Sequence, residues 1–484
     1  MMAKEFYIDK FLDESLYRQE DKPHDNEEDF QDVCKMVEEV FNKEWEETDD
    51  ASKNRKLERE KRAIIGYESE SNYYREKIKE ILRQKKLMDK WYPTWYPNLC
   101  EAVFCEVYGL AGLAPWAYDM TKEYMQSSSA KLIGERLYCL IDGKATLQPQ
   151  RISRRRREQL KRTLLLESPY ERLQYGFHEV YLHNGIRITI FSGDRTKDNE
   201  DVMVFRKYIL KELTFQQLAA LETIPEEAIP MFRAMIAIGY NVIFAGQVRS
   251  GKTTFMQTWQ RYEDPTLEGL AIATDPETPW HRIMPDVPIM QLVADGSDLD
   301  KIIKSLLRGD NDYVLLEEMR DATAFKTALD ITSTGTQRSK CTIHDSSAVN
   351  IPYKMATQIL SKYGGDLNSI IAQVFKNYNY VFEFAQEEDD KSMKKLVGIV
   401  EYRYEAEHDR VSVHRICRYE YESGKWTWNW DIGDDKRTLG GKYPDQLKIF
   451  DDTLKALARD NPMAGSGVVI PAYYKSSKEG GDQR

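Results

Sequence analysis

The segment from Gly246 to Thr254 constrains this chain more than any other stretch of its sequence. It fits the pattern G-x-x-x-x-G-K-[ST], in which backbone N–H groups wrap a polyphosphate, the lysine reaches the β- and γ-phosphates and the hydroxyl holds Mg²⁺. Residues 241–245 predict a buried strand before this loop, and residues 254–260 predict a helix after it, whose N-terminus favours phosphate charge. The sequence therefore predicts a site for a nucleotide and Mg²⁺, with Thr253 as a magnesium ligand. The nucleotide-binding residues are expected to be Gly246, Gln247, Val248, Arg249, Ser250, Gly251, Lys252, Thr253 and Thr254.

The composition is that of a globular protein with more than one domain. Its 484 residues suggest two to four domains, and 41% hydrophobic with 31% charged residues is ordinary for a chain with a sizeable core. A formal net charge of -11 argues against a general nucleic-acid coat. Residues 1–13 lack the pattern of a signal peptide, and no apolar run is long enough to span a bilayer. The six cysteines are scattered and contain no C-x-x-C pair, which favours a reducing cytoplasm without a zinc site or disulfide framework.

Four segments differ in their sequence pattern. Residues 1–98 are highly charged and predict amphipathic helices, with a disordered or solvated stretch near residues 46–62. Residues 99–208 mix short strands and helices, as expected of a small α+β domain. Residues 209–460 alternate strand and helix like a parallel α/β sheet and then become β-rich. Residues 461–484 are expected to form a mobile tail.

Two unusual stretches are interpreted as structural features, in preference to binding sites. Residues 91–97 (WYPTWYP) predict an extended linker packed on its own domain, with a docking strip for a partner as the alternative. Residues 151–157 carry a basic run at the start of a helix, which is interpreted as a solvated helix face. Contact of this run with acidic lipid head groups or a nucleic acid is the alternative.

Strand candidates in the α/β region lead to charged residues at one edge of the predicted sheet. They are residues 241–245, 269–273, 289–293, 313–316 and 341–343. Further strands are expected at 396–404 and 410–419, then three tryptophans (426, 428 and 430) on one strand face, and a last helix at 450–459. In a parallel sheet the carboxyl ends of the strands face the same crevice as the phosphate loop.

The residues that follow these strands are the candidate catalytic groups. Glu318 is expected to orient and deprotonate the attacking water, and Glu317 beside it to hold Mg²⁺. Glu277 follows the second strand, Arg320 adds to a charged cleft after the fourth, and His344 ends the fifth. The alternative for the two glutamates is the start of a surface loop.

The order of phosphate loop, acidic box, Glu-Glu strand and histidine box resembles that of the secretion ATPase superfamily of type II and type IV secretion, type IV pili and conjugation. Its Tad-pilus and conjugation-type branch is the most similar. Residues 306–320 resemble the family's LLR-x-x-x-D-x-hydrophobic-E-x-R block, and residues 342–344 resemble its T-I-H histidine box. Residues 232–234 and the strand after them resemble its entry to the phosphate loop, and residues 108–115 resemble the start of its N-terminal domain.

The resemblance implies an α/β fold: a RecA-type P-loop motor domain, a smaller α+β sensor-like N-terminal domain and a helical, charged N-terminal extension. It implies a homo-hexamer that hydrolyses ATP, with Arg187 and Arg206 completing the site from the N-terminal side. The implied partner is an integral-membrane platform protein. The implied location is the inner face of the cytoplasmic membrane, held peripherally and without direct sequence-specific binding of nucleic acid. A pilin, a protein and a DNA strand all stay open as the transported substrate.

The sequence also departs from the family pattern, and other functions stay open. Gln247, Val248 and Arg249 replace smaller residues of the phosphate loop, Glu317 replaces a glycine, and Thr274 replaces a glutamate of the acidic box. Asp310 replaces an arginine, and Asp345 follows the histidine box instead of alanine. These changes favour one alternative, an ATP-binding assembly scaffold with little turnover. A small-molecule kinase and a helicase are further alternatives, for which no acceptor motif and no basic-aromatic groove pattern are present.

Overall fold

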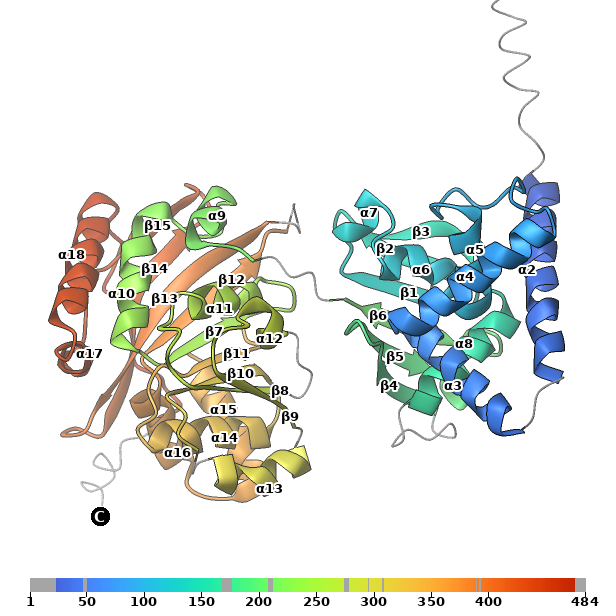
Figure 1. Ribbon diagram of the computed structural model, residues 1–484. Coiled ribbons are helices and arrows are strands. Elements are labelled where there is room, and N and C mark those ends of the chain that lie inside the picture. The colour runs from blue at the N-terminus through green and yellow to red at the C-terminus, as the bar shows by residue number, and fades with distance from the viewer. Residues whose placement is uncertain are drawn as a thin grey trace, which may run out of the picture. The chain divides into compact units, whose positions relative to one another are not determined.

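The computed structural model describes residues 23–46, 50–167, 176–207, 212–273, 278–294, 296–306, 309–388, 390 and 393–474. The chain divides into two compact units, residues 1–209 and residues 210–484. Both units mix helices and strands (Figure 1). The α/β fold class predicted from the sequence is therefore confirmed.

The first unit pairs a bundle of helices with an antiparallel sheet. Among the described residues its strand order is β3-β2-β1-β6-β5-β4. The strands are β1 (Ser129–Ile133), β2 (Arg136–Ile141), β3 (Lys144–Arg151), β4 (Phe177–Tyr181), β5 (Arg187–Phe191) and β6 (Val202–Arg206). The helices are α2 (Pro23–Glu46), α3 (Asp50–Ile65), α4 (Glu68–Gln84), α5 (Leu99–Tyr108), η1 (Ala111–Leu113), α6 (Ala114–Ala117), α7 (Lys122–Met125), α8 (Arg154–Glu167) and η2 (Gly193–Arg195).

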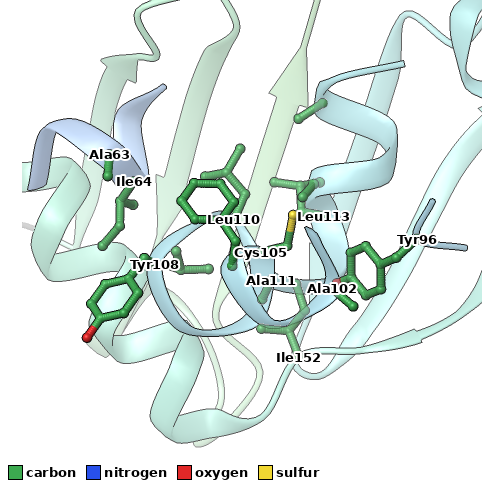
Figure 2. Close-up of a cluster of buried hydrophobic side chains, with 14 of the residues drawn as sticks. Ala63, Ile64, Tyr96, Ala102, Cys105, Tyr108, Leu110, Ala111, Leu113 and Ile152 are labelled. Atoms are coloured by element: carbon green, nitrogen blue, oxygen red, sulfur yellow. The ribbon is translucent and has the colours of Figure 1, made fainter. Parts of the chain in front are cut away.

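One hydrophobic core joins the N-terminal helices to the rest of the first unit (Figure 2). Ile64 of α3 and Cys105 of α5 are fully buried in it, together with Leu110 and Ile152. Tyr96, in the Pro-rich stretch, is 3% exposed and donates a hydrogen bond to Glu106 at 2.6 Å. Residues 91–97 therefore pack on their own unit, whereas a domain boundary at residue 98 stays a prediction.

Two sequence-based expectations for this unit hold only in part. The stretch near residues 46–62, predicted to be disordered or solvated, contains helix α3, and its side chains at residues 53–62 are half-buried or exposed, so it is solvated and not disordered; only the end of the helix, at Ile64, is anchored in the core. The basic run at residues 151–157 has five arginines, of which Arg151, Arg154 and Arg155 are exposed, as a solvated face requires. Arg156 is buried and donates to the carbonyl of Gly109 at 2.5 Å, and Arg157 is 1% exposed and donates to Asn199 Oδ1 at 2.7 Å. Two of the five arginines are therefore used inside the unit.

The second unit is built on one mixed sheet. Among the described residues its strand order is β15-β14-β13-β12-β7-β11-β10-β8-β9, with β16 paired to β14. Strands from β12 to β9 are parallel, and those from β12 to β15 are antiparallel. They are β7 (Val242–Gly246), β8 (Gly269–Ala273), β9 (Ile289–Val293), β10 (Tyr313–Met319), β11 (Lys340–Ile343), β12 (Tyr380–Gln386), β13 (Lys394–Glu405), β14 (Arg410–Glu420), β15 (Lys425–Trp428) and β16 (Val468–Val469).

Helices cover both faces of this sheet, as parallel strands require. Figure 1 shows α10 and α18 on one side and α14, α15 and α16 on the other, and each side has its own core. All residues of β7 and β8 are buried, in line with their apolar sequences. The helices are α9 (Phe215–Ala220), η3 (Glu226–Ala228), α10 (Ile229–Ile238), α11 (Lys252–Gln260), α12 (Trp280–Ile283), α13 (Gly296–Leu306), α14 (Ala322–Ser333), α15 (Ile351–Tyr363), α16 (Leu367–Asn377), α17 (Asp434–Gly440) and α18 (Pro444–Asp460).

The strands predicted in this region are present, and the differences lie toward the C-terminus. Trp428 is buried in β15, but the strand ends there, so Trp430 lies outside it and is 45% exposed. The part of the predicted mobile tail that the structure describes, residues 461–474, contains β16 on the edge of β14. Among the described residues, no helix is both long and apolar enough to cross a membrane.

Candidate nucleotide-binding site

The phosphate loop connects the buried end of β7 to the first turn of α11. Its two glycines have positive φ angles, 152° at Gly246 and 92° at Gly251. A Cβ at Gly246 would clash with the carbonyl oxygen of Phe384 and would stand 2.5 Å from Ser250 Oγ. Only glycine therefore fits where the loop leaves the strand, because the backbone of β12 passes directly beside it.

The loop contains groups that suit a polyphosphate. Ser250 is fully buried, and its Oγ has no hydrogen-bond partner among the described residues. Lys252 is 6% exposed and donates to the carbonyl of Gln247 at 2.6 Å, so its ammonium group lies over the loop. An unpartnered buried hydroxyl and a buried cation at a helix N-terminus are groups that a phosphate would satisfy. The residues present therefore fit the phosphates of a nucleotide.

One loop residue departs from what the backbone prefers. Arg249 is exposed and has a φ of 64°, in the left-handed region where a side chain costs roughly 1–2 kcal/mol. The substitution noted in the sequence at this position therefore introduces strain into the phosphate loop. Thr253 and Thr254 follow in the first turn of α11, and Thr254 accepts a hydrogen bond through its carbonyl from Thr258 at 3.0 Å.

A chain of polar contacts joins the ends of three adjacent strands. Lys252 Nζ, after β7, lies 3.3 Å from His344 Nδ1, after β11. His344 Nε2 lies 2.8 Å from Glu318 Oε1 in β10. An ammonium group only donates, so Nδ1 of His344 accepts, and Nε2 then carries the proton that is donated to Glu318. The phosphate loop, the Glu-Glu strand and the histidine box thus meet at one edge of the sheet.

A bulge in β10 separates the directions of the two neighbouring glutamates. The pairing of β10 with β11 shifts between Leu316 and Met319, and Glu318 has a φ of 56°. Its backbone N–H donates to the hydroxyl of Thr342 at 2.7 Å, which holds the irregular turn against β11. Bulges commonly redirect a side chain beside an active site, and here the bulge directs Glu318 toward His344.

Glu318 is held as a carboxylate. Burial raises the pKa of its side chain, but hydrogen bonds from His344 and Arg320 and the charge of Arg320 outweigh that cost and lower the pKa to about 2. Arg320 also forms an ion pair with Glu318. The resting site therefore has an ionised acceptor of low basicity, whereas a general base works best with a pKa near the operating pH.

Glu317 contacts a different set of residues, and its role as a ligand of Mg²⁺ stays a prediction. Its side chain is 5% exposed and accepts hydrogen bonds from Trp280 Nε1 at 2.9 Å and from the N–H of Thr278 at 3.2 Å. Gln257 of α11 donates to the Thr278 hydroxyl at 2.9 Å. Glu317 therefore anchors the segment that follows the acidic box through these two hydrogen bonds.

This anchoring role predicts that Glu317 contributes to stability. Glu317→Ala would leave two buried N–H donors, of Thr278 and Trp280, without an acceptor, and we expect a loss of roughly 2–4 kcal/mol in the free energy of unfolding. Chemical denaturation measures that loss, with Glu317→Gln as the milder control that retains one acceptor. A Glu317→Gln protein whose Mg²⁺ requirement for nucleotide binding is strongly raised would contradict the anchoring role.

Comparison with known proteins places this domain in a family. A family model described as type II/IV secretion system protein matches residues 197–425, a range that holds the phosphate loop, Glu318 and His344. These residues belong to the type II/IV secretion system protein family. A search of curated proteins gave no match.

Solved structures of secretion and pilus ATPases resemble the chain weakly. The VirB11 ATPase of the Brucella suis type IV secretion system is 16% identical, with 59% of this chain and 94% of that chain covered and a TM-score of 0.31. The Legionella pneumophila ATPase DotB is 13% identical, with 70% of this chain and 87% of that chain covered and a TM-score of 0.41. The pilus retraction motor PilT with bound ADP is 13% identical, with 70% of this chain and 90% of that chain covered and a TM-score of 0.41. At these scores the likeness carries no argument about function.

The remaining residues predicted for the site are placed as follows. Glu277 lies outside the described residues. Arg187 and Arg206 are opposite each other in the register of β5 and β6, in the first unit. Arg187 forms an ion pair with Glu179 at 2.5 Å, and Arg206 is exposed at the end of β6. The family match includes Arg206 and begins after Arg187.

Sequence reasoning missed the residues that hold the site in shape. Thr342 and Thr278 accept and donate hydrogen bonds that fix Glu318 and Glu317, but a threonine in or after a strand gives no signal of its own. Thr342 does belong to the T-I-H box. The only sequence signal for its role was this place in the motif, two residues before His344, from which its hydroxyl contacts the neighbouring strand β10.

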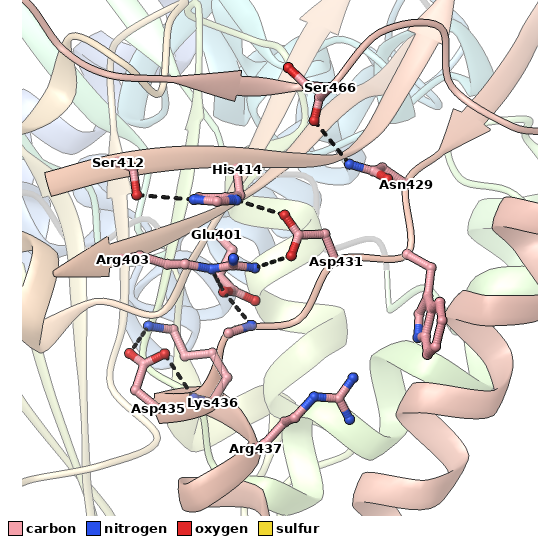
Figure 3. Close-up of polar contacts among 12 residues, drawn as sticks. Glu401, Arg403, Ser412, His414, Asn429, Asp431, Asp435, Lys436, Arg437 and Ser466 are labelled. Atoms are coloured by element: carbon pink, nitrogen blue, oxygen red, sulfur yellow. Dashed lines mark hydrogen bonds and ion pairs between the residues drawn. The ribbon is translucent and has the colours of Figure 1, made fainter. Parts of the chain in front are cut away.

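A second polar array in this domain contains a serine, a histidine and an aspartate, like a hydrolase triad, but its serine is not accessible to a substrate. Ser412 Oγ lies 3.0 Å from His414 Nε2, and His414 Nδ1 lies 2.7 Å from Asp431 Oδ2 (Figure 3). Hydrogen bonds from His414 and Arg403 lower the pKa of Asp431 to about 2. Ser412 is 1% exposed within β14, so no substrate reaches its hydroxyl. The array fastens the segment around Asp431 to the sheet.

Proposed function

We propose that this protein is a homo-hexameric ATPase that hydrolyses ATP to ADP and phosphate. The hydrolysis would power a type IV secretion, conjugation or Tad-like pilus assembly machine at the inner face of the cytoplasmic membrane. An integral-membrane platform protein would receive the motion. The observation that carries this proposal is the contact chain Lys252–His344–Glu318 on a secretion-family domain.

Each residue of the chain has a distinct task in the proposed reaction. Residues 246–254 bind the phosphates of ATP, and Lys252 turns from the Gln247 carbonyl and His344 toward the β- and γ-phosphates. The Thr253 hydroxyl would hold Mg²⁺, which supplies positive charge to the phosphates when bound. Glu318 orients the attacking water and accepts its proton.

The low pKa of Glu318 sets a condition on that last step. A carboxylate with a pKa of about 2 is a weak proton acceptor, so the contact with Arg320 has to loosen before Glu318 can serve as the base. Arg320 is 44% exposed at its side chain and can leave without crossing a packed core. A nucleotide that attracts Arg320 would raise the basicity of Glu318 as it binds.

Arg206 is proposed to stabilise charge on the γ-phosphate during turnover. Arg206→Ala is expected to leave ATP binding by isolated subunits unchanged and to lower the turnover of assembled protein by about a thousandfold, as removal of an arginine finger does. Phosphate release by the assembled protein measures the effect. Arg154→Ala, which removes another exposed arginine of the first unit, is the control. Turnover equal to that of the control would remove Arg206 from the site.

An ATP-binding scaffold with little turnover is the second candidate. The strained Arg249, the Glu317 anchor and the weakly basic Glu318 favour it, because all three are departures from an efficient hydrolytic site. Purified protein incubated with ATP and Mg²⁺ distinguishes the two. Steady release of phosphate supports the motor, and saturable ATP binding without phosphate release supports the scaffold.

A further inference from the structure

Two buried side chains from outside the phosphate site hold the loop that follows His344. This histidine loop, residues 344–350, passes Ala348, which is fully buried. The N–H of Ala348 donates to Glu383 Oε1 at 2.7 Å, and the hydroxyl of Tyr402 donates to the Ala348 carbonyl at 2.5 Å. Glu383 is 5% exposed and Tyr402 is fully buried. Both polar groups of one peptide position are thus fixed by side chains of β12 and β13.

Glu383 is itself fixed in direction. Arg415 of β14 donates to Glu383 Oε2 through Nη1 at 2.6 Å. Gly398 of β13 leaves the space for this pair, since a Cβ there would overlap both Arg415 Nη1 and Glu383 Oε2. Glu383 is aligned with Ala245, the residue before Gly246, in the pairing of β12 with β7. The carboxylate is therefore one strand away from the phosphate loop, and three strands cooperate to aim it.

The ends of the histidine loop are tied as well. Lys354 of α15 donates to the carbonyl of His344 at 2.5 Å. Tyr473, in the C-terminal segment, donates through its hydroxyl to the carbonyl of Val349 at 2.5 Å, and its ring lies 5.2 Å from that of Tyr353. The loop is therefore held along its length, from the residue that contacts Glu318 to the start of α15.

We propose that Glu383 and Tyr402 are positioning residues for His344, and through it for Glu318, an inference that rests on the proposed ATPase function. Apolar residues of the same volume often stabilise a fold more than a buried ion pair such as Glu383–Arg415 does. Here the ion pair fixes the orientation of the Glu383 carboxylate, which accepts the hydrogen bond from the Ala348 N–H. His344 contacts Glu318 at 2.8 Å and Lys252 at 3.3 Å, so a small shift of the loop would lengthen both contacts.

The same domain offers matched controls that do not touch the histidine loop. Glu401 is fully buried in β13, accepts from Arg403 Nε at 2.5 Å and accepts from the N–H of Gly433 at 2.9 Å (Figure 3). It thus resembles Glu383 in burial, arginine partner and backbone partner. Tyr380 is fully buried like Tyr402 and donates to Glu401 at 2.8 Å. In the strand pairing, Tyr380 lies opposite Glu401 of β13 on one side and opposite Val242, at the start of β7, on the other.

The experiment compares Glu383→Gln with Glu401→Gln, and Tyr402→Phe with Tyr380→Phe. We expect kcat for ATP to fall by about tenfold or more in the first member of each pair, with KM within about twofold of the wild-type value. The controls are expected to lose similar thermal stability and to keep kcat. Equal kcat values within each pair would overturn the positioning role.

A second readout does not depend on turnover. The chain has seven histidines, so the ring C–H signals of ¹³C-labelled histidine can be assigned with a His344→Gln protein. The His344 signal should shift in Glu383→Gln and Tyr402→Phe and stay in place in the two controls. An unmoved His344 signal in Glu383→Gln overturns the inference, whereas absent ATP turnover in the wild type with a moved signal overturns only the proposed motor.

Discussion

Glu318→Gln is expected to bind ATP as tightly as the wild type and to hydrolyse it at least about a hundredfold more slowly. Glutamine has the shape of glutamate and keeps an oxygen toward His344, so the contact at 2.8 Å can persist. It cannot take a proton from water, and it cannot pair with the charge of Arg320. Binding should survive because the phosphate loop, which holds the nucleotide, is unchanged.

Phosphate release under saturating ATP measures the first effect, and calorimetric titration measures the binding. Glu317→Gln is the control at the neighbouring position, where the side chain points to Trp280 instead of His344. The control should hydrolyse ATP within a few-fold of the wild type. If Glu318→Gln hydrolyses ATP at the wild-type rate, Glu318 is not the base and the reaction uses another acceptor.

Lys252→Ala is expected to weaken ATP binding by about a hundredfold and to abolish measurable hydrolysis. The ammonium group lies over the phosphate loop, 2.6 Å from the Gln247 carbonyl, and is almost fully buried. A charge-assisted hydrogen bond in such a place contributes about 1.5–3 kcal/mol, which is roughly one to two powers of ten in affinity. Hydrolysis loses more, because charge on the phosphates grows in the transition state.

Titration with ATP and with a non-hydrolysable analogue measures the change in affinity. Lys455→Ala, on the exposed side of α18, removes the same charge far along the sequence from the loop and is the control. Affinity for ATP that equals the control's would mean that the loop does not bind phosphate in this protein.

The edge of the sheet was predictable from sequence because its strands are short apolar runs that end in charged residues. β7, β8, β9, β10 and β11 follow from that pattern, and parallel pairing then brings Lys252, Glu318 and His344 to one side. Because these three residues follow or end neighbouring parallel strands, contacts among their side chains are expected. The contacts of Glu317 with Thr278 and Trp280 could not be predicted in this way, because the bulge beside Glu317 involves the hydroxyl of Thr342 on another strand.

Other features were hidden because they depend on partners far away in the sequence. The burial of Arg156 requires the carbonyl of Gly109, and that of Arg157 requires Asn199, and neither can be read from a basic run. The contacts that fix the histidine loop also come from residues far away in the sequence. Glu383 and Tyr402 look like ordinary strand residues until the fold brings Ala348 between them.

ATP hydrolysis over a range of protein concentrations, with mass measurement on the same samples in ATP and Mg²⁺, tests the central claim most directly. The proposed motor predicts that specific activity rises as hexamers form and disappears in Glu318→Gln at the same degree of assembly. Tight ATP binding without phosphate release in fully assembled hexamers would contradict the motor and favour the scaffold.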